Sequence, residues 1–366
     1  NCYPVTSIFL NPSSSADSRA FVQFNLVGAN AYVFTNQAYL PGFSVWQAAK
    51  GKLEAPRVSP LKMKKFLYAK FLVDAPILTV SNRNIGIGFF VRGRSEADIR
   101  NIPYELTKIF IQQNVDTSLK EYDLNLRNVK LSNMTWVEYG VNFAKMYRKR
   151  DNRLTILGAN AKYLTGINIL YANLERLKVH VDTTMADVEK LKGKVRFNEP
   201  DWDAGRGFAF DLGITYKKTL EWLDGYYANS KKSDCKYIDY GYKVGISLLD
   251  MGFIRFNNTT YKASIEGSAK IENFQEVSSL DSLLKYDFKA SVKNNSPIWA
   301  SLPTALCAQG DWNLNHHFYV SGVIIKNLVP TRMVGVQRAN LFSVAPRFEH
   351  RQVEFSMPLT FHRFIY

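Results

Sequence analysis

The stretch Gly205–Lys217 restricts the fold of this chain more than any other, because its side chains alternate strictly in character. The residues of one parity are large and apolar, namely Phe208, Phe210, Leu212, Ile214 and Tyr216. Those of the other parity are small or polar, namely Gly207, Ala209, Asp211, Gly213, Thr215 and Lys217. Such alternation predicts a β-strand, whose successive side chains point to opposite faces. The pattern is typical of a barrel wall between lumen and lipid, although one strand of a soluble β-sandwich fits this stretch nearly as well.

The same alternation returns along most of the chain. It is clearest in five further segments, Phe21–Gly28, Ile85–Arg92, Trp136–Tyr147, Leu154–Thr165 and Tyr237–Leu249. Charged turns and the lack of helical crossover units favour an antiparallel meander. We therefore predict an all-β fold, an antiparallel transmembrane β-barrel of roughly 14 strands with one or two short helices. A large soluble sandwich or a propeller is the alternative, and the lack of a fixed-period repeat weakens the propeller.

The predicted barrel is a single domain over residues 1–366, and the loop-like segment 1–17 is predicted to enter its lumen as a plug. Helical spacing of apolar residues predicts a helix over Glu96–Asn114, with Pro103 in its first turn. Weaker patterns suggest short helices around 185–191 and 278–285. Three polar stretches are predicted to be long loops, 40–64, 182–204 and 218–236.

The composition limits the function classes that remain. The net charge is +15, but Lys and Arg are scattered and no RNA-binding or zinc-ligand motif is present, so we expect no nucleic-acid partner. An aromatic content of 14% is high, as in large antiparallel sheets and interfacial aromatic girdles. No apolar run is long enough for a transmembrane helix. The start at Asn1-Cys2 rather than Met indicates a chain from which a signal peptide has been removed.

The chain carries no motif that points to catalysis or to a cofactor. It has no G-x-S-x-G, H-E-x-x-H, G-x-G-x-x-G or P-loop sequence. His316 and His317 are adjacent, and on a strand they would point to opposite faces rather than form a metal site. Glu199, Asp201 and Asp203 resemble a cation-binding loop, but the full ligand spacing is missing and a solvated loop tip is favoured. The sequence thus predicts a protein that is not an enzyme, without catalytic residues, cofactor or metal.

Parity assigns side chains to the two faces of the predicted wall. Five charged residues are predicted to face the lumen, Arg92, Lys162, Asp211, Lys217 and Lys243. Five apolar residues are predicted to face lipid or a membrane-embedded partner, Phe208, Phe210, Leu212, Ile214 and Tyr216. Inward charges would line a polar channel or pair with one another to close it.

Several segments, taken in order, resemble a known family. They are LNP at 10–12, the strand–turn–strand 85–94, NIPYEL at 101–106, TWVEYGVNFAK at 135–145, GFAFDLGITYK at 207–217 and YGYKVGISLLDMG at 240–252. This succession resembles a family of outer-membrane β-barrels of unknown function from Bacteroidota-type bacteria. That family is similar in architecture to PorV-type barrels and to the long-chain fatty-acid transporters. The resemblance implies the outer membrane of a Gram-negative bacterium and brings no catalytic motif with it.

Two functions from different classes follow. The first is a structural or accessory subunit of a larger envelope assembly of the secretion (type IX), gliding or barrel-assembly type. Its partners would be outer-membrane lipid and other outer-membrane or periplasmic proteins. The second is a transporter or channel for hydrophobic or small solutes. A lipid-modifying enzyme is a third reading, but it needs a Ser–His or paired-carboxylate constellation that the sequence lacks.

Overall fold

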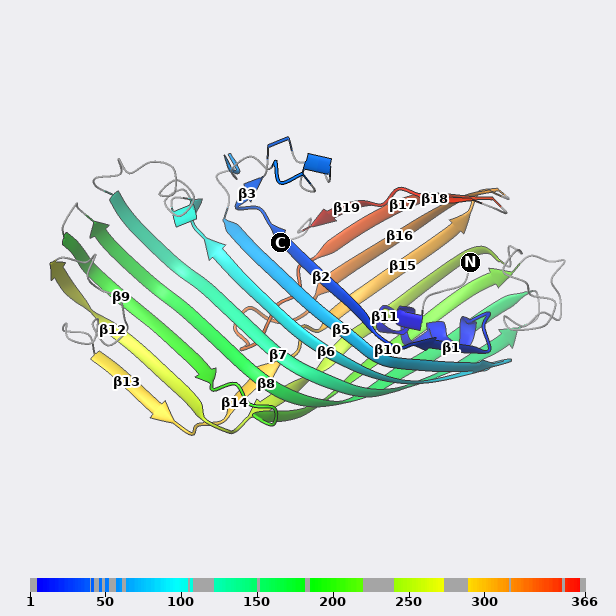
Figure 1. Cartoon of the computed structure of the whole chain (residues 1–366), viewed down its shortest axis with the longest axis horizontal. Coiled ribbons are helices and arrows are strands. Elements are labelled where there is room, and N and C mark those ends of the chain that lie inside the picture. Colours follow the sequence, from blue (N-terminus) through cyan, green and yellow to red (C-terminus); the bar gives the residue numbers. More distant parts are fainter. Residues whose placement is uncertain are drawn as a thin grey trace.

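The computed structural model of the chain is almost entirely β-structure (Figure 1). It describes residues 5–39, 41–42, 46–47, 50–52, 57–60, 64–104, 106–107, 122–149, 152–181, 185–219, 240–272, 289–315, 317–350 and 353–362. Within these residues, one antiparallel sheet contains 17 strands, and β3 (Ala38–Tyr39) pairs with β4 (Arg57–Val58) in a second small sheet. The predicted all-β antiparallel class is confirmed, with more strands than the roughly 14 expected.

The strands of the large sheet follow one another through most of the chain. The first eight are β1 (Val22–Asn25), β2 (Gly28–Thr35), β5 (Lys65–Asn82), β6 (Ile85–Ile102), β7 (Tyr122–Lys149), β8 (Arg153–Val181), β9 (Met185–Asn198) and β10 (Gly205–Thr219). The others are β11 (Tyr240–Phe256), β12 (Thr260–Glu272), β13 (Lys289–Asn294), β14 (Ile298–Ser301), β15 (Ala305–Asn313), β16 (Phe318–Asn327), β17 (Leu341–Glu349), β18 (Glu354–Ser356) and β19 (Leu359–His362).

The sheet divides at β8. Residues 153–166 of β8 pair with β10, and residues 170–181 pair with β9. One branch continues through β10, β11, β15, β16 and β17 and, with β5 to β8, forms a curved wall. The other branch is β9, β12 and β13. Together with residues 122–133 of β7 and 168–181 of β8, these three strands form a projection that we call the arm (Figure 1, lower left).

The wall curls, so that β5 to β8 cross β11, β15, β16 and β17 obliquely in Figure 1. Two short 3₁₀ helices, η1 (Val5–Phe9) and η2 (Pro12–Asp17), lie within the curl. Asn11 caps η2, because its side chain accepts a hydrogen bond from the Ser13 backbone N–H. Every residue of η2 is buried. Residues 5–17 therefore lie on the concave side of the sheet.

One edge of the wall is formed by β1 and β2, which pair with β5, and the other by β18 and β19, which pair with β17. In the described part of the chain, β2 pairs only with β5 and β19 pairs only with β17. The edges nevertheless meet through side chains, since Tyr32 Oη lies 2.6 Å from Nε2 of His362. The rings of Phe34 and His362 have centroids 3.8 Å apart. Backbone pairing does not close the described sheet, and the closed barrel stays a prediction.

The helix predicted over Glu96–Asn114 is wrong in its first part, because 96–102 belongs to β6. Apolar residues at helical spacing suggested the helix, whereas 96–102 continue a strand on which Arg94, Glu96, Asp98 and Arg100 are all buried. Some of their partners come from other strands, such as Glu138 for Arg94 and Lys70 for Glu96, and no local pattern contains such contacts. Tyr104, Leu106 and Thr107 are helical, Pro103 belongs to no helix or strand, and residues 105 and 108–114 lie outside the described ranges.

The loop predicted over 182–204 is wrong for 185–198, together with its helix around 185–191, because these residues form β9, whereas 199–204 do form a loop. Pairing with β8 on one side and β12 on the other makes this polar sequence a strand. The helix predicted over 278–285 lies outside the described residues, as do most of 218–236 and parts of 40–64.

Candidate functional site

The strand β10 separates two environments. Phe208, Phe210, Leu212 and Ile214 are 60%, 52%, 51% and 43% exposed, and Tyr216 is half-buried. The neighbouring side chains Asp211, Thr215 and Lys217 are buried on the concave face. The structure thus places the apolar parity of this stretch outside and the polar parity inside. Contact of the outer face with lipid stays a prediction.

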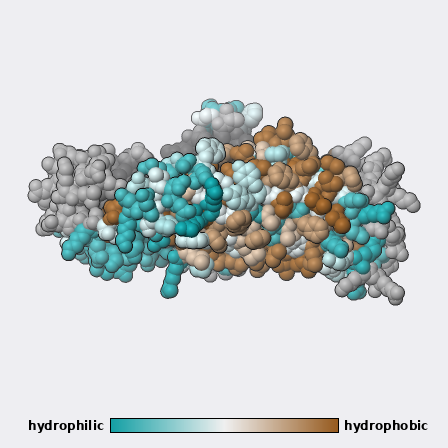
Figure 2. Space-filling view, turned by 90° about the horizontal axis from the view of Figure 1, so that it is seen from below, coloured by the Kyte–Doolittle hydropathy of each residue, from teal (hydrophilic) through white to brown (hydrophobic). Residues whose placement is uncertain are grey.

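The outer face of the neighbouring strands is apolar as well. Large apolar side chains are exposed on β6 to β8 and on β11, among them Ile85, Ile87, Phe89, Tyr139, Val141, Phe143, Leu157, Tyr163, Ile246 and Phe253. Figure 2 shows hydrophobic residues gathered over the middle of this view, while the side that carries the arm is mainly hydrophilic. We call this surface the apolar band. Its exposed large apolar residues run from Tyr139 to Tyr147 on β7, from Leu157 to Tyr163 on β8 and from Phe208 to Ile214 on β10, close to the length of a transmembrane β-strand.

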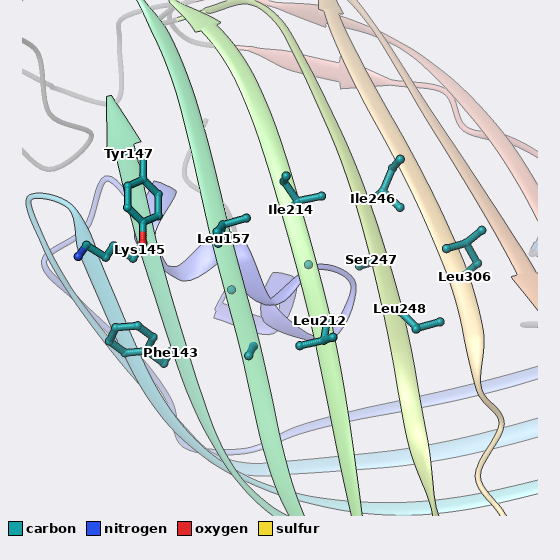
Figure 3. Close-up of a pocket in the computed structure, with 13 residues that line it drawn as sticks. Phe143, Lys145, Tyr147, Leu157, Leu212, Ile214, Ile246, Ser247, Leu248 and Leu306 are labelled. Atoms are coloured by element: carbon teal, nitrogen blue, oxygen red, sulfur yellow. The ribbon is translucent and has the colours of Figure 1, made fainter. Parts of the chain in front are cut away.

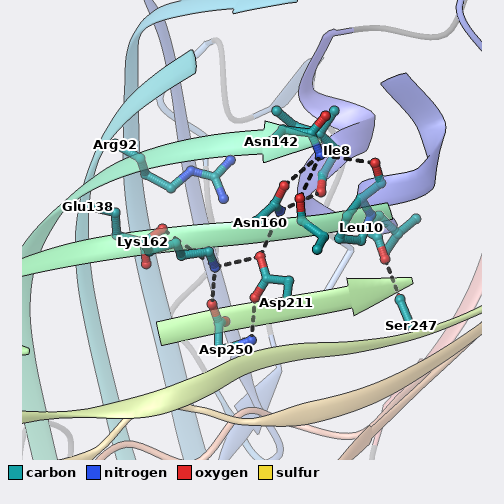
Figure 4. A network of polar contacts seen from close by, with 12 residues as sticks. Ile8, Leu10, Arg92, Glu138, Asn142, Asn160, Lys162, Asp211, Ser247 and Asp250 are labelled. Atoms are coloured by element: carbon teal, nitrogen blue, oxygen red, sulfur yellow. Dashed lines mark hydrogen bonds and ion pairs between the residues drawn. The ribbon is translucent and has the colours of Figure 1, made fainter. Parts of the chain in front are cut away.

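On the inside, wall side chains bind the backbone of the N-terminal segment (Figure 4). Asn160 donates to the carbonyl of Ile8 at 3.1 Å, and Ser247 donates to that of Leu10 at 2.6 Å. Asn142 donates to the carbonyl of Pro12 at 3.0 Å. Amide and hydroxyl groups of β7, β8 and β11 thus satisfy backbone groups that the 3₁₀ helices leave buried.

Two glycines let the segment approach the wall. A Cβ at Gly213 would lie 2.1 Å from Oδ1 of Asn11, and one at Gly158 would lie 2.3 Å from the backbone nitrogen of Ser13. Both distances are far below a van der Waals contact, so no larger residue fits with the segment in place. Beside them, the side-chain amide of Asn11 donates to Oγ1 of Thr215 at 3.2 Å. The N-terminal segment therefore packs directly against the small inward residues of β8 and β10.

The segment ends in a buried ionic clamp. One oxygen of Asp17 lies 2.9 Å from Nζ of Lys217 and the other lies 2.6 Å from Nζ of Lys243. Burial alone would raise the pKa of the Asp17 carboxyl, but the two ammonium groups outweigh burial and hold the pKa well below its ordinary value of 3.8. Asp17 is therefore a carboxylate at neutral pH, and it ties the segment to β10 and β11.

A second buried cluster lies deeper in the curl (Figure 4). Nζ of Lys162 lies 2.7 Å from Asp211 and 2.7 Å from Asp250. Arg94 joins Asp250 at 2.9 Å and Glu138 at 2.7 Å. These ion pairs offset the free-energy cost of removing the charges from water, and their side chains fill the interior of the curl.

The connection between β16 and β17 adds a cation to this cluster. Arg338 reaches Asp250 with Nη2 at 2.8 Å. Burial would lower the pKa of Arg338, but the carboxylates of Asp250 and Glu96 outweigh burial and raise it. Charges from β6, β7, β8, β10 and β11 therefore meet a residue from beyond β16 on one concave surface.

All five residues predicted to face the lumen are buried on the concave face. Lys162 and Asp211 belong to the deep cluster, and Lys217 and Lys243 to the clamp. Arg92 pairs with Asp74, and its guanidinium lies 3.2 Å from the ring centroid of Phe9.

Sequence reasoning did not assign roles to Asn11, Asp17, Arg94, Glu138, Asp250 or Arg338. Strand parity would have found Arg94 and Glu138, because both lie on the buried parity of β6 and β7. No local pattern singles out Asp17 or Arg338, since neither lies on a strand.

Two hollows flank the site. An inner cavity of about 320 Å³ lies between the N-terminal segment and the edges of the wall, and Phe9, Tyr32, Leu72, Arg338 and His362 are among its lining residues. An outer groove of about 530 Å³ runs across β7, β8, β10, β11 and β15. Figure 3 shows apolar side chains along this groove and the N-terminal segment behind the wall. The inner cavity is lined by both polar and apolar side chains, whereas the outer groove is lined almost entirely by apolar ones.

The remaining candidate residues have structural partners. Asp203 pairs with Arg206 at 2.5 Å, and Glu199 accepts a hydrogen bond from Tyr261 at 3.0 Å. Nδ1 of His317 lies 3.0 Å from the carbonyl of Glu349, and His316 lies outside the described residues.

Three further observations concern the described part of the chain. Cys307 is a buried free thiol, while Cys2 and Cys235 lie outside the described residues. No cluster of three or more His, Cys, Asp or Glu residues suited to a metal ion occurs among the described residues. None of the described helices is both long and apolar enough to cross a membrane.

Comparison with curated proteins finds no match. A family model does match, and its description is a family of unknown function, DUF5723. The match runs over residues 12–366 and includes η2 and every strand of the sheet. The similarity to PorV-type and fatty-acid-transporter barrels stays a prediction. The chain belongs to the family DUF5723.

Proposed function

We propose that this protein is a non-enzymatic outer-membrane β-barrel of a Gram-negative bacterium. In this proposal it is a structural or accessory subunit of a larger envelope assembly of the secretion, gliding or barrel-assembly type. The observation that carries the proposal is the contrast between the two faces of the wall. The outer face is an exposed apolar band, and the inner face is occupied by the N-terminal segment and by paired charges.

The membrane location is supported by the chemistry of the band. A soluble protein rarely exposes so continuous an apolar surface, whereas hydrocarbon requires one. Closure of the wall into a barrel is supported by the contacts of Tyr32 and Phe34 with His362. In lipid, an unpaired strand edge would leave backbone groups unsatisfied, so pairing of β2 with β19 is favoured there.

The partner role is supported by the arm, which continues the sheet beyond the apolar band. β9 carries a cation at every second position, Lys190, Lys192, Lys194 and Arg196. Lys192 and Lys194 are half exposed, although each pairs with a carboxylate, Glu266 at 3.2 Å and Glu175 at 2.7 Å. A rigid cationic sheet outside the membrane suits an acidic face of another envelope protein.

A transporter is the second candidate, and the inner cavity is the observation that favours it. The cavity lies beside the contact between Tyr32 and His362, where the wall would have to open. Movement of a solute through it would require release of the N-terminal segment from Asn142, Asn160 and Ser247.

Purification from native membranes tests the first candidate. We expect a partner protein to co-purify in a fixed ratio with the wild type. Lys192→Glu combined with Lys194→Glu and Arg196→Glu should remove that partner. As a control, Lys52→Glu with Arg83→Glu and Lys218→Glu changes three exposed cations outside the arm by the same charge. Equal recovery of the partner by both triple variants would contradict the role of the arm.

Reconstitution in liposomes tests the second candidate. A filled barrel should give no ion conductance. Conductance or solute uptake by the wild type, changed by Asp211→Asn or Lys243→Gln, would make the transporter the better reading.

A further inference from the structure

The segment 328–340, between β16 and β17, crosses the concave face, and we call it the inner strap. Its Gln337 backbone N–H donates to Oδ1 of Asp98 at 2.9 Å on β6. On the other side, its Val334 carbonyl accepts from the Ser301 backbone N–H at 2.9 Å. Gly335 has φ +138°, and a Cβ there would lie 2.3 Å from the carbonyl oxygen of Ser301. The strap is therefore seated by specific contacts and by a position that favours glycine.

A second inner cavity, of about 320 Å³, lies between the strap and strands β5 to β7. Cations dominate its charged lining, with Lys64, Arg100, Lys130 and Arg338 against a single carboxylate, Asp98. Side-chain amides surround them, Asn101, Asn327, Gln337 and Asn340. An excess of fixed positive charge is the chemistry of an oxyanion site.

Arg100 is the central group of this cavity. It is only 6% exposed, its Nε pairs with Asp98, and its Nη2 donates to Ser132 at 3.4 Å. Its Nη1 is buried without a hydrogen-bond partner among the described residues, and so is Nε of Arg338. Buried guanidinium donors are rarely left unsatisfied, because the cost of their lost hydration is then not offset. A ligand that accepts hydrogen bonds and carries negative charge would satisfy both.

The position of the cavity decides which ligands reach it. On β6 the outward side chains of the apolar band are Ile85, Ile87, Phe89 and Val91, and they are followed by Gly93, Ser95 and Ala97. Arg100 lies beyond this change, and Lys130 lies on the neighbouring β7. The cavity therefore lies near the end of the wall where β7 continues into the arm.

We propose that this cavity binds a phosphate group, held by Arg100, Lys130 and Arg338. A phosphate dianion matches the excess of cations better than a single carboxylate does, and a guanidinium pairs with its oxygens in a bidentate manner. The volume of about 320 Å³ leaves room for a small organic group attached to the phosphate. The source is a small water-soluble phosphate ester or the headgroup of a lipid. Binding here does not require the protein to be an accessory subunit.

Titration of the purified full-length protein in detergent with inorganic phosphate tests the site, at constant ionic strength held with chloride. We expect phosphate to raise the thermal midpoint of the wild type. Arg100→Gln should weaken phosphate binding about tenfold or more, and Arg100→Lys should weaken it less. Arg176→Gln, which removes an exposed guanidinium on the arm, should bind like the wild type.

Two further measurements keep the outcome clear. Lys130→Gln tests the same site if Arg100→Gln fails to fold, and it should also weaken binding. Micelles containing phosphatidic acid separate the two sources. A lipid headgroup is the ligand if these micelles, but not free phosphate, stabilise the protein in an Arg100-dependent way. Equal responses of wild type, Arg100→Gln and Lys130→Gln to both probes would overturn the proposal.

Discussion

At the scale of single residues, the concave face is organised by a few buried groups that fix the N-terminal segment. Asp17 is the strongest of them, because one carboxylate binds two ammonium groups that come from different strands. Gly158 and Gly213 contribute by having no side chain. Charge and the absence of a Cβ act together here, since the carboxylate reaches its partners only if the segment rests directly on the wall.

Replacement of Asp17 by Asn should lower the free energy of unfolding by about 3–5 kcal/mol at neutral pH, because two buried ammonium groups lose their carboxylate. The folded-state pKa of Asp17 is below its ordinary value of 3.8, so its stabilisation is complete above pH 3.8 and is lost as the pH falls below that value. Urea unfolding in detergent from pH 7 to pH 3 measures this. The free energy of unfolding should fall less at acid pH in Asp17→Asn than in the wild type. Identical pH dependence in the two proteins would contradict the clamp.

Gly213→Ala tests the close approach of the segment. The added methyl group would overlap Asn11, so we expect a loss of about 1–3 kcal/mol in the free energy of unfolding and easier proteolysis of the N-terminal segment. Gly322→Ala is the matched control on β16, because a Cβ at this position would lie 4.0 Å from its nearest neighbour, the carbonyl oxygen of Ser343. Equal effects of the two substitutions would argue against steric contact with the segment.

At the scale of elements, strands of one sheet serve different surroundings along their length. β7 and β8 begin or end in the apolar band and continue into the arm, where their most exposed residues are polar or charged, such as Asp123, Arg176 and Lys178. The same backbone pairing therefore supports a surface suited to hydrocarbon and a surface suited to water. The loss of stability on replacing an exposed apolar residue by a charged one should accordingly depend on its position along the sheet.

Leu212 and Val292 allow this to be measured, since they are 51% and 60% exposed. Leu212 lies in the apolar band on β10, and Val292 lies in the arm on β13. Leu212→Arg should destabilise the protein folded in lipid vesicles by about 2–4 kcal/mol if the band spans the bilayer. Val292→Arg should change stability by less than about 1 kcal/mol at a water-exposed position. Chemical unfolding in vesicles compares the two, and similar losses would count against a membrane-embedded band.

At the scale of the whole molecule, the main question is how the two edges of the wall contact each other. β2 and β19 approach through Tyr32, Phe34 and His362, while their backbones have no partner across this contact in the described residues. The N-terminal segment and the inner strap fill the curl from two sides. The interior therefore holds the molecule together even where the sheet does not pair.

Cross-linking tests closure of the wall. In a background with the three native cysteines replaced by Ser, Phe34→Cys combined with His362→Cys should react with a short bifunctional thiol reagent in lipid vesicles, because their ring centroids are 3.8 Å apart. The linked protein should keep a folded, faster electrophoretic mobility after mild heating. Phe34→Cys with Phe253→Cys, on a strand far along the wall, serves as the control. Equal cross-linking of the two cysteine pairs would contradict closure of the wall.

Much of the wall was predictable because strand parity is a local property of the backbone. In β10, the sequence alone separates Phe208, Phe210 and Leu212 from Asp211 and Thr215, since neighbouring side chains of a strand point to opposite faces whatever lies around them. The same reasoning led to the buried positions of Lys162 and Lys243.

Tertiary structure decided what those faces contact. The apolar residues of 96–114 fall at helical spacing in sequence, whereas β6 continues to Ile102, and Glu96 is buried there against Lys70 of β5 as well as Arg94. Asp17 finds Lys217 across 200 positions of sequence, and such a contact leaves no local pattern. The reason is physical, since a buried charge is stable only beside its partner, and the curl of the whole sheet determines which partners come within reach.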